Sequence, residues 1–134
     1  MKKYEVLEHK GDLKIRVWAG DLKGLFLNCL IGMYKAARYQ GEGKLLKRKI
    51  KISSSELPSL LVDFLSEVLY LTEVYQEVYR KIEFKKFNEK NLEGILTGEK
   101  LKRMGVQIKA VTYHGLEIKQ KKDGRWEAAV LFDI

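Results

Sequence analysis

The chain has 134 residues, a length that suits one domain, because two equal halves would each lie near the lower limit for an independent hydrophobic core. Hydrophobic residues make up 46% of the sequence and charged residues 33%, which argues against both a disordered chain and a membrane-spanning one. The net charge of +8 at pH 7 favours an anionic partner such as RNA, a phosphorylated ligand or an acidic protein surface. We therefore expect a single domain over residues 1–134.

Cysteine usage and the N-terminal residues indicate the compartment. Cys29 is the only cysteine, which excludes an internal disulfide and a zinc site built from several cysteines. It lies among apolar residues at helical spacing, so we interpret it as a core residue rather than a nucleophile. The basic N-terminus lacks the apolar run of an export signal. These features predict a cytoplasmic protein with no membrane contact.

Apolar residues recur with two different periods along the chain. Alternation of apolar and polar residues predicts eight strands, at residues 4–8, 13–19, 46–52, 78–87, 92–96, 106–113, 116–121 and 126–133. Helical spacing predicts one helix from an N-cap at Asp21 to a stop at Gly41, and a second over residues 57–72 with Pro58 in its first turn. Turns are predicted at residues 10–12, Asn88, Gly98, His114–Gly115 and Asp123–Gly124.

This order of elements predicts an α+β fold, in which two amphipathic helices pack on one face of a mostly antiparallel mixed sheet. The open face of that sheet would carry ten basic residues: Lys14, Arg16, Lys47, Lys49, Lys51, Lys81, Lys85, Lys109, Lys119 and Lys121. With Trp18 and Tyr79 between them, this face resembles a platform for single-stranded RNA. Lysines also keep ordinary sheets solvated, and this plainer explanation is preferred on composition alone.

Motifs of an independent enzyme are missing from the sequence. The segment Gly41–Glu42–Gly43–Lys44 lacks the spacing of a phosphate-binding loop and is followed by Leu45 rather than Ser or Thr. His9 and His114 are the only imidazoles, and no nucleophile motif accompanies them. We interpret His114, beside Gly115, as part of a hairpin turn, with a functional contact as the alternative.

Carboxylates gather at the end of the chain. The last predicted strand alternates up to the final residue, so Asp133 and the α-carboxylate of Ile134 are neighbours, and Asp12 joins them if this strand ends beside the first hairpin turn. Three adjacent anions repel one another, and oxygen ligands favour a divalent cation such as Ca²⁺, Mg²⁺ or Mn²⁺. Alternatively, the terminal carboxylates extend into water and Asp12 completes an Asx turn. Spacing alone favours this second explanation.

Three segments resemble the archease family. They are the opening YEVLEH with Asp12, the helical LLVDFLSEVLYL at residues 60–71, and KAVTYHGLEI at residues 109–118, followed by Trp126 and the terminal FDI. The resemblance implies the archease fold and a non-enzymatic activator of the GTP-dependent tRNA-splicing RNA ligase, which promotes guanylylation of the ligase's histidine and repeated turnover. It also implies a second partner, a tRNA cytosine-5 methyltransferase, for which family members act as a chaperone.

The resemblance also assigns site residues. It implies that Asp12, Asp133 and the terminal carboxylate of Ile134 surround a divalent cation, with Ca²⁺ as the first candidate. The candidates for orienting this site or contacting the partner are His9, Lys10, His114 and Lys109. The sequence departs from the family pattern at Lys10–Gly11, where Thr-Ala is usual, and at residues 98–104, where the family's Asp and His are replaced.

Overall fold

Seven strands and two helices make up the fold in the computed structural model, which describes residues 2–9 and 11–134, with only the backbone of Glu8 and His9. Their order is β1 (Tyr4–His9), β2 (Asp12–Ala19), α1 (Leu22–Ala37), β3 (Gln40–Ser53), α2 (Leu57–Tyr75), β4 (Glu77–Phe87), β5 (Asn91–Arg103), β6 (Ala110–Gln120) and β7 (Trp126–Asp133). Within the described residues, neither helix combines the length and the apolar content that a membrane crossing requires.

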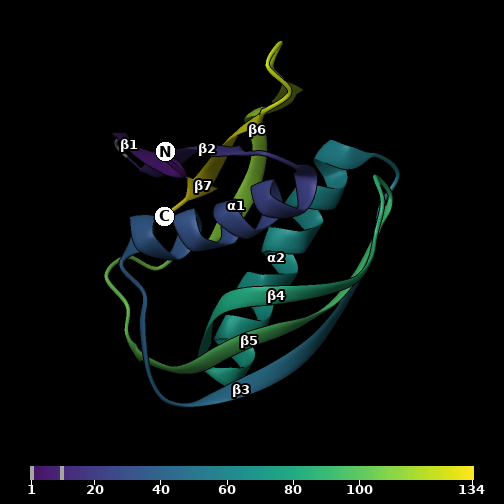
Figure 1. Cartoon of the computed structure of the whole chain (residues 1–134). Coiled ribbons are helices and arrows are strands. Elements are labelled where there is room, and N and C mark those ends of the chain that lie inside the picture. The colour runs from purple at the N-terminus through teal and green to yellow at the C-terminus, as the bar shows by residue number, and fades with distance from the viewer. Residues whose placement is uncertain (1, 10) are drawn as a thin grey trace.

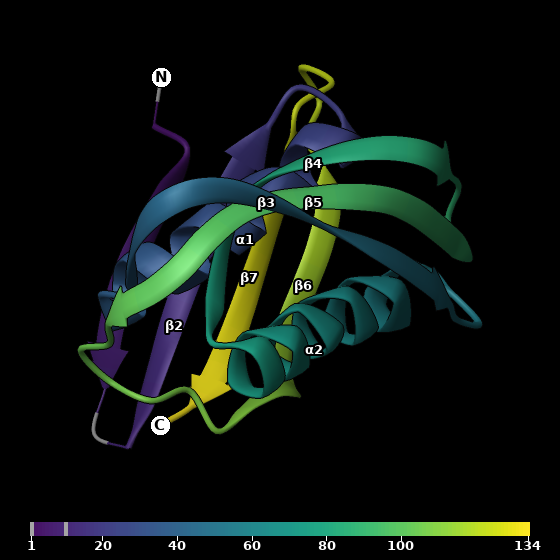
Figure 2. The same cartoon turned by 90° about the horizontal axis from the view of Figure 1, so that it is seen from below.

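The strands form two antiparallel sheets. Sheet A has the order β1-β2-β7-β6, and sheet B has the order β3-β5-β4. Helix α1 contacts β1, β2 and β7, while α2 contacts β6, so both helices cover the same face of sheet A. Sheet B packs against the helices from the other side (Figures 1 and 2), which leaves the outer face of each sheet without a covering helix.

The predicted α+β class is confirmed, as is the packing of both helices on one sheet face, but the strands form two sheets rather than one. β5 lies between β3 and β4, and those two strands form the edges of sheet B. Both edge strands carry several lysines and are irregular where they pair with β5, and such features discourage further pairing. Period-two alternation reveals that a segment is a strand but does not reveal which neighbours it pairs with.

Three glycines were assigned wrong roles by the sequence. Helix α1 stops at Ala37, not at Gly41, because Arg38 adopts the left-handed conformation (φ 57°) of a C-terminal cap. Gly98 lies inside β5, where a Cβ atom would clash with the carbonyl oxygen of Val78. Gly115 (φ 67°) lies in an irregular stretch of β6, so two predicted strands are one continuous strand.

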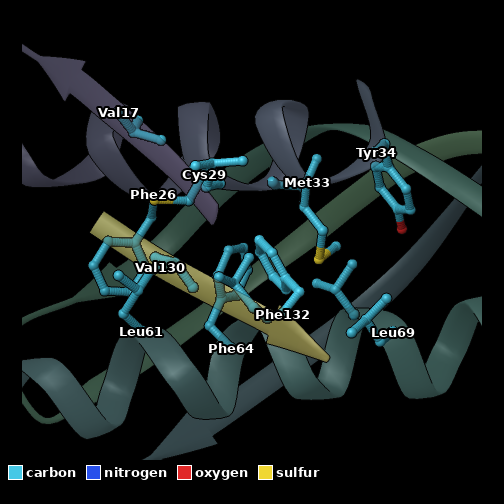
Figure 3. Packing of buried hydrophobic residues seen from close by; sticks show 14 of the residues in the cluster. Val17, Phe26, Cys29, Met33, Tyr34, Leu61, Phe64, Leu69, Val130 and Phe132 are labelled. Atoms are coloured by element: carbon cyan, nitrogen blue, oxygen red, sulfur yellow. The ribbon is translucent and has the colours of Figure 1, made fainter. Parts of the chain in front are cut away.

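Apolar residues from both helices and from sheet A meet in one buried cluster (Figure 3). Phe26 of α1 lies 5.6 Å, between ring centroids, from Phe64 of α2, and Phe132 of β7 is fully buried in the same cluster. Cys29 is also fully buried there, and burial raises the pKa of its thiol. The interpretation of Cys29 as a core residue is therefore confirmed.

Candidate functional site

Asp12 and Asp133 lie opposite each other at one end of sheet A. Asp12 begins β2 and Asp133 ends β7, and the two residues are register partners in the antiparallel β2–β7 pair. Directly paired residues project from the same face of a sheet, with Cβ atoms about 4.5–5.5 Å apart. Because the alternating residues Leu13 and Phe132 are buried against the helices, both aspartates belong to the outer face.

Main-chain hydrogen bonds hold the end of the chain beside the first hairpin turn. The N–H of Ile134 donates to the carbonyl oxygen of Gly11 at 3.4 Å, and the N–H of Lys109 donates to the carbonyl oxygen of Asp133 at 2.8 Å. Gly11 has a φ of 83°, a conformation that favours glycine in a tight turn. The last strand therefore ends beside residues 11 and 12, which is the condition under which the sequence analysis brings Asp12 next to the chain end.

The environment of the two aspartates suits a bound cation. The Oδ1 atom of Asp12 is buried and finds no hydrogen-bond partner among the described residues, whereas Asp133 is exposed. An unpaired buried carboxylate oxygen is costly, and a second carboxylate opposite it adds repulsion. A hard divalent cation with oxygen ligands would relieve both effects. The residues present thus fit the group that the family resemblance implies.

The number of side-chain ligands is small. Among the side chains of residues 2–7 and 11–134, no three from His, Cys, Asp or Glu come close enough together to hold a metal ion. Within that part of the chain, further oxygen donors would come from the main chain, water, the terminal carboxylate or a partner. Such a site would be open, with coordination positions left for a ligand.

Of the other candidate residues, His9 and Lys109 are close to this pair in the strand register, and His114 is further away in β6. The backbone of His9 is the register partner of Asp12, but its side chain and the whole of Lys10 lie outside the described residues. Lys109 is exposed and precedes Ala110, the register partner of Asp133. His114 lies further along the continuous strand β6, so the predicted hairpin turn at His114 is wrong. Its N–H donates to Oγ1 of Thr112 at 3.1 Å.

The predicted basic face divides into two. Lys14, Arg16 and Lys119 belong to the outer face of sheet A, whereas Lys47, Lys49, Lys51 and Lys81 belong to the outer face of sheet B. Tyr79 is fully buried and donates its hydroxyl hydrogen to Glu77 at 2.7 Å, so it is not available to stack on a base. The expectation of one continuous basic face with Tyr79 on it is therefore wrong.

The sequence analysis missed two buried carboxylates, Glu77 of β4 and Glu127 of β7. Glu127 is 6% exposed, although it lies on the outer face of sheet A. It accepts a hydrogen bond from Nε1 of Trp18 at 2.7 Å, and Arg16, Lys119 and Lys121 all lie within 4 Å of it. Burial raises the pKa of this carboxyl group, but the hydrogen bonds from Trp18 and Lys119 and the nearby lysine charges lower it overall. Trp18 and Lys119 are the cross-strand partners of Glu127. The sequence could not indicate this cluster, because the register of β2 and β6 with β7 was not known.

Solved structures of other proteins share this α+β fold with two helices and two sheets. The chain is similar to Protein 1598 of Methanobacterium thermoautotrophicum (TM-score 0.73, 23% identity, all of both chains) and to a Thermotoga maritima archease described as a possible chaperone (TM-score 0.72, 18% identity, 96% of this chain and 94% of that one). At these identities the two structures establish the fold alone.

Sequence relatives identify the family. The family model described as "Archease protein family (MTH1598/TM1083)" matches residues 4–134. Protein archease of Methanosarcina acetivorans is 36% identical over 99% of this chain and 97% of its own length, and Protein archease of Pyrococcus abyssi is 32% identical over the whole of both chains. The chain belongs to the archease family.

Proposed function

We propose that this protein is a non-enzymatic activator of the GTP-dependent tRNA-splicing RNA ligase, and that it acts through the end of sheet A that carries Asp12 and Asp133. The observation that carries the proposal is the pairing of these two aspartates across β2 and β7, with the buried Oδ1 of Asp12 lacking a hydrogen-bond partner among the described residues. Family membership supports the choice of partner.

The side chains of Asp12 and Asp133, with the α-carboxylate of Ile134, are the proposed ligands of a divalent cation, with Ca²⁺ as the first candidate. Such a cation would stabilise negative charge on phosphate oxygens. Nucleotidyl transfer needs this stabilisation, because negative charge develops on these oxygens in its transition state. Asp133 is exposed at this end of sheet A, where a partner can reach it. Lys109, and the residues His9 and Lys10 of the hairpin, are the proposed contacts with the partner around this end.

Guanylylation of the ligase tests the proposal. The ligase is incubated with labelled GTP and a tenth of its own concentration of this protein, and covalent GMP on the ligase is measured over time. We expect the wild-type protein to accelerate GMP transfer to all ligase molecules, since an activator is not consumed. Asp12→Ala, Asp133→Ala and a chain extended by Gly-Ser after Ile134 should each lose most of this acceleration.

The matched control is Glu89→Ala, which removes an exposed carboxylate from the turn between β4 and β5 on sheet B. It should activate as well as the wild type. Full activity of Asp12→Ala and Asp133→Ala would contradict the role of the aspartate pair, and a wild-type protein without effect on GMP transfer would contradict the proposed partner. Thermal unfolding of each variant shows whether it still folds. Repeating the unfolding at increasing calcium concentrations shows whether it still binds the ion, because binding raises the melting temperature.

The second proposed partner is a tRNA cytosine-5 methyltransferase. We propose that this protein acts as its chaperone, in the cytoplasm. The finding that favours it is the description of the similar Thermotoga maritima protein as a possible chaperone. We expect the chain to change the yield of active methyltransferase, or the cytosines it modifies, when the two are mixed. An unchanged methylation pattern and unchanged enzyme recovery would contradict this second role.

A further inference from the structure

The outer face of sheet B carries a group of exposed lysines. We call this group the lysine face; its members are Lys47, Lys49 and Lys51 of β3 and Lys81, Lys85 and Lys86 of β4. The register places Lys47 and Lys81 on either side of Thr97, and Lys51 and Lys86 on either side of Glu93. No helix covers this side of the sheet, which lies nearest the viewer in Figure 2. Two rows of lysines therefore border the central strand β5.

The lysine face carries more positive than negative charge, because its six lysines share this side of sheet B with two carboxylates, Glu83 and Glu93. Lys85 lies 2.6 Å from Glu83, but among the described residues none of the other five lysines has a carboxylate oxygen within 4.0 Å. The outer face of sheet A is different, because Arg16, Lys119 and Lys121 all lie within 4 Å of Glu127. The outer face of sheet B is therefore more positive than the surroundings of Glu127 on sheet A, beyond the lysines that edge strands carry to discourage pairing.

A shallow hollow lies within the lysine face. Its volume is about 390 Å³, and it is lined by Lys49, Lys51 and Lys85 together with Ile95, Glu93 and the neighbouring residues Ile50 and Gly94. The side chain of Ile95 thus lies among three cationic side chains and one carboxylate, Glu93. The excess of cationic groups suits the phosphates of a nucleic-acid backbone, with a ribose able to contact Ile95.

The spacing of the lysines also matches a linear polyanion. Alternate residues of an antiparallel strand are about 6.8 Å apart, so Lys47, Lys49 and Lys51 repeat at an interval close to that of phosphates in an extended nucleic-acid strand. We propose that the lysine face binds the backbone of single-stranded RNA. The choice of RNA over DNA rests on the proposed function, whereas the binding of a linear polyanion rests on the lysines alone.

This binding should be electrostatic and independent of base sequence. Phe84 and Phe87 of β4 pack against the hydrophobic core rather than on the lysine face, and Tyr79 is buried, so these rings are not available for base stacking. Affinity must then come from phosphate contacts, each of which contributes about −0.7 to the slope of log K against log salt for a single strand. Six contacts predict a slope of about −4.

Fluorescence anisotropy of a labelled 20-nucleotide polyuridine, titrated with the wild-type protein at 50 to 200 mM KCl, measures this slope directly. The variant K47Q/K49Q/K51Q should bind at least tenfold more weakly at 50 mM KCl, with a slope reduced to about −2. The control K14Q/K23Q/K122Q removes the same charge from other parts of the surface and should stay within about twofold of the wild type. Circular dichroism confirms that both variants are folded.

Three results would overturn the inference: no binding by the wild type, an equal loss in both variants, or equally tight binding of a 20-residue polyglutamate, which would point to an acidic protein partner. Ligase guanylylation measured without RNA separates this inference from the proposed function. K47Q/K49Q/K51Q should activate guanylylation like the wild type, so a failure of RNA binding and a failure of activation are distinguished.

Discussion

Asp12 and Asp133 are direct cross-strand partners at the end of sheet A, and the Oδ1 atom of Asp12 is buried without a hydrogen-bond partner among the described residues. Two adjacent carboxylates destabilise a folded protein unless a positive charge balances them. By contrast, the carboxylate of Glu127, buried on the outer face of sheet A, is surrounded by Trp18, Arg16 and two lysines. This contrast between Glu127 and the Asp12–Asp133 pair supports our proposal that the pair binds a cation.

The first prediction concerns the variant Asp12→Asn. In EDTA it should be more stable than the wild type, by about 1 kcal/mol, because one of two repelling charges is removed. Calcium at 100 times its dissociation constant should stabilise the wild type by about 2.7 kcal/mol and the variant far less. Chemical denaturation with and without calcium measures both effects. Equal calcium stabilisation of the two proteins would rule out Asp12 as a ligand.

The second prediction concerns the buried Glu77. Arg48 donates two hydrogen bonds to this carboxylate, at 2.8 and 2.9 Å, and these bonds, against the opposing effect of burial, hold the pKa of Glu77 below its usual value. Glu77→Gln should lower the free energy of unfolding at pH 7 by about 2 kcal/mol, because the charge-assisted bonds are lost.

The same variant has a predicted pH dependence. The folded-state pKa of Glu77 is lowered, so its ionisation stabilises the protein fully above the unfolded pKa of about 4.3, and this contribution is lost as pH falls through the folded value. The difference between wild type and Glu77→Gln should therefore be constant from pH 7 to about pH 5 and shrink at lower pH. Urea denaturation at a series of pH values measures it, and a difference that grows on acidification would contradict the assignment.

The third prediction concerns the packing of the two helices. Phe64 of α2 is fully buried against Phe26 of α1, so Phe64→Ala should cost about 3–5 kcal/mol through lost burial and the cavity left behind. Tyr70 lies on the same helix but is 59% exposed, and Tyr70→Ala should change stability by less than about 1 kcal/mol. Thermal unfolding of the two variants compares them, and similar losses would contradict the described helix orientation.

The fourth prediction concerns a close approach between two strands of sheet B. A Cβ atom at Gly98 would clash with the main chain of Val78 and Tyr79, so Gly98→Ala should destabilise the protein by about 1–3 kcal/mol. The matched control is Gly20→Ala, where no atom lies within 4 Å of the added methyl group and no positive φ is present. The control should leave stability unchanged within about 0.5 kcal/mol. A neutral Gly98→Ala would show that β4 and β5 lie further apart.

Local patterns predicted the elements better than their partners. The alternation in β2 and β7 already places Leu13 and Phe132 on the core side, and therefore Asp12 and Asp133 on the outer side. Their direct pairing depends on a register between residues more than a hundred positions apart, which no local pattern contains. The sequence analysis could bring Asp12 to the chain end only on the condition that the last strand ends beside the first hairpin turn, and the main-chain hydrogen bonds show that it does.

The errors have a common physical origin. Gly98 and Gly115 were interpreted as turns because glycine is frequent in turns, whereas they permit a close strand contact and an irregularity within β6. Arg38, which ends α1, carries no signal for a left-handed conformation. The division of the lysines between sheets A and B likewise follows from strand order, which is set by long-range packing.

The most direct test of the proposed activator role is a double-mutant cycle at the aspartate pair. The rate of GMP transfer to the ligase is measured with the wild type, Asp12→Asn, Asp133→Asn and the double variant, each at the same low concentration. If the two carboxylates act as one unit, each single variant loses most of the acceleration and the double variant is no slower than either. Single variants as fast as the wild type, or losses that multiply in the double variant, would contradict the account.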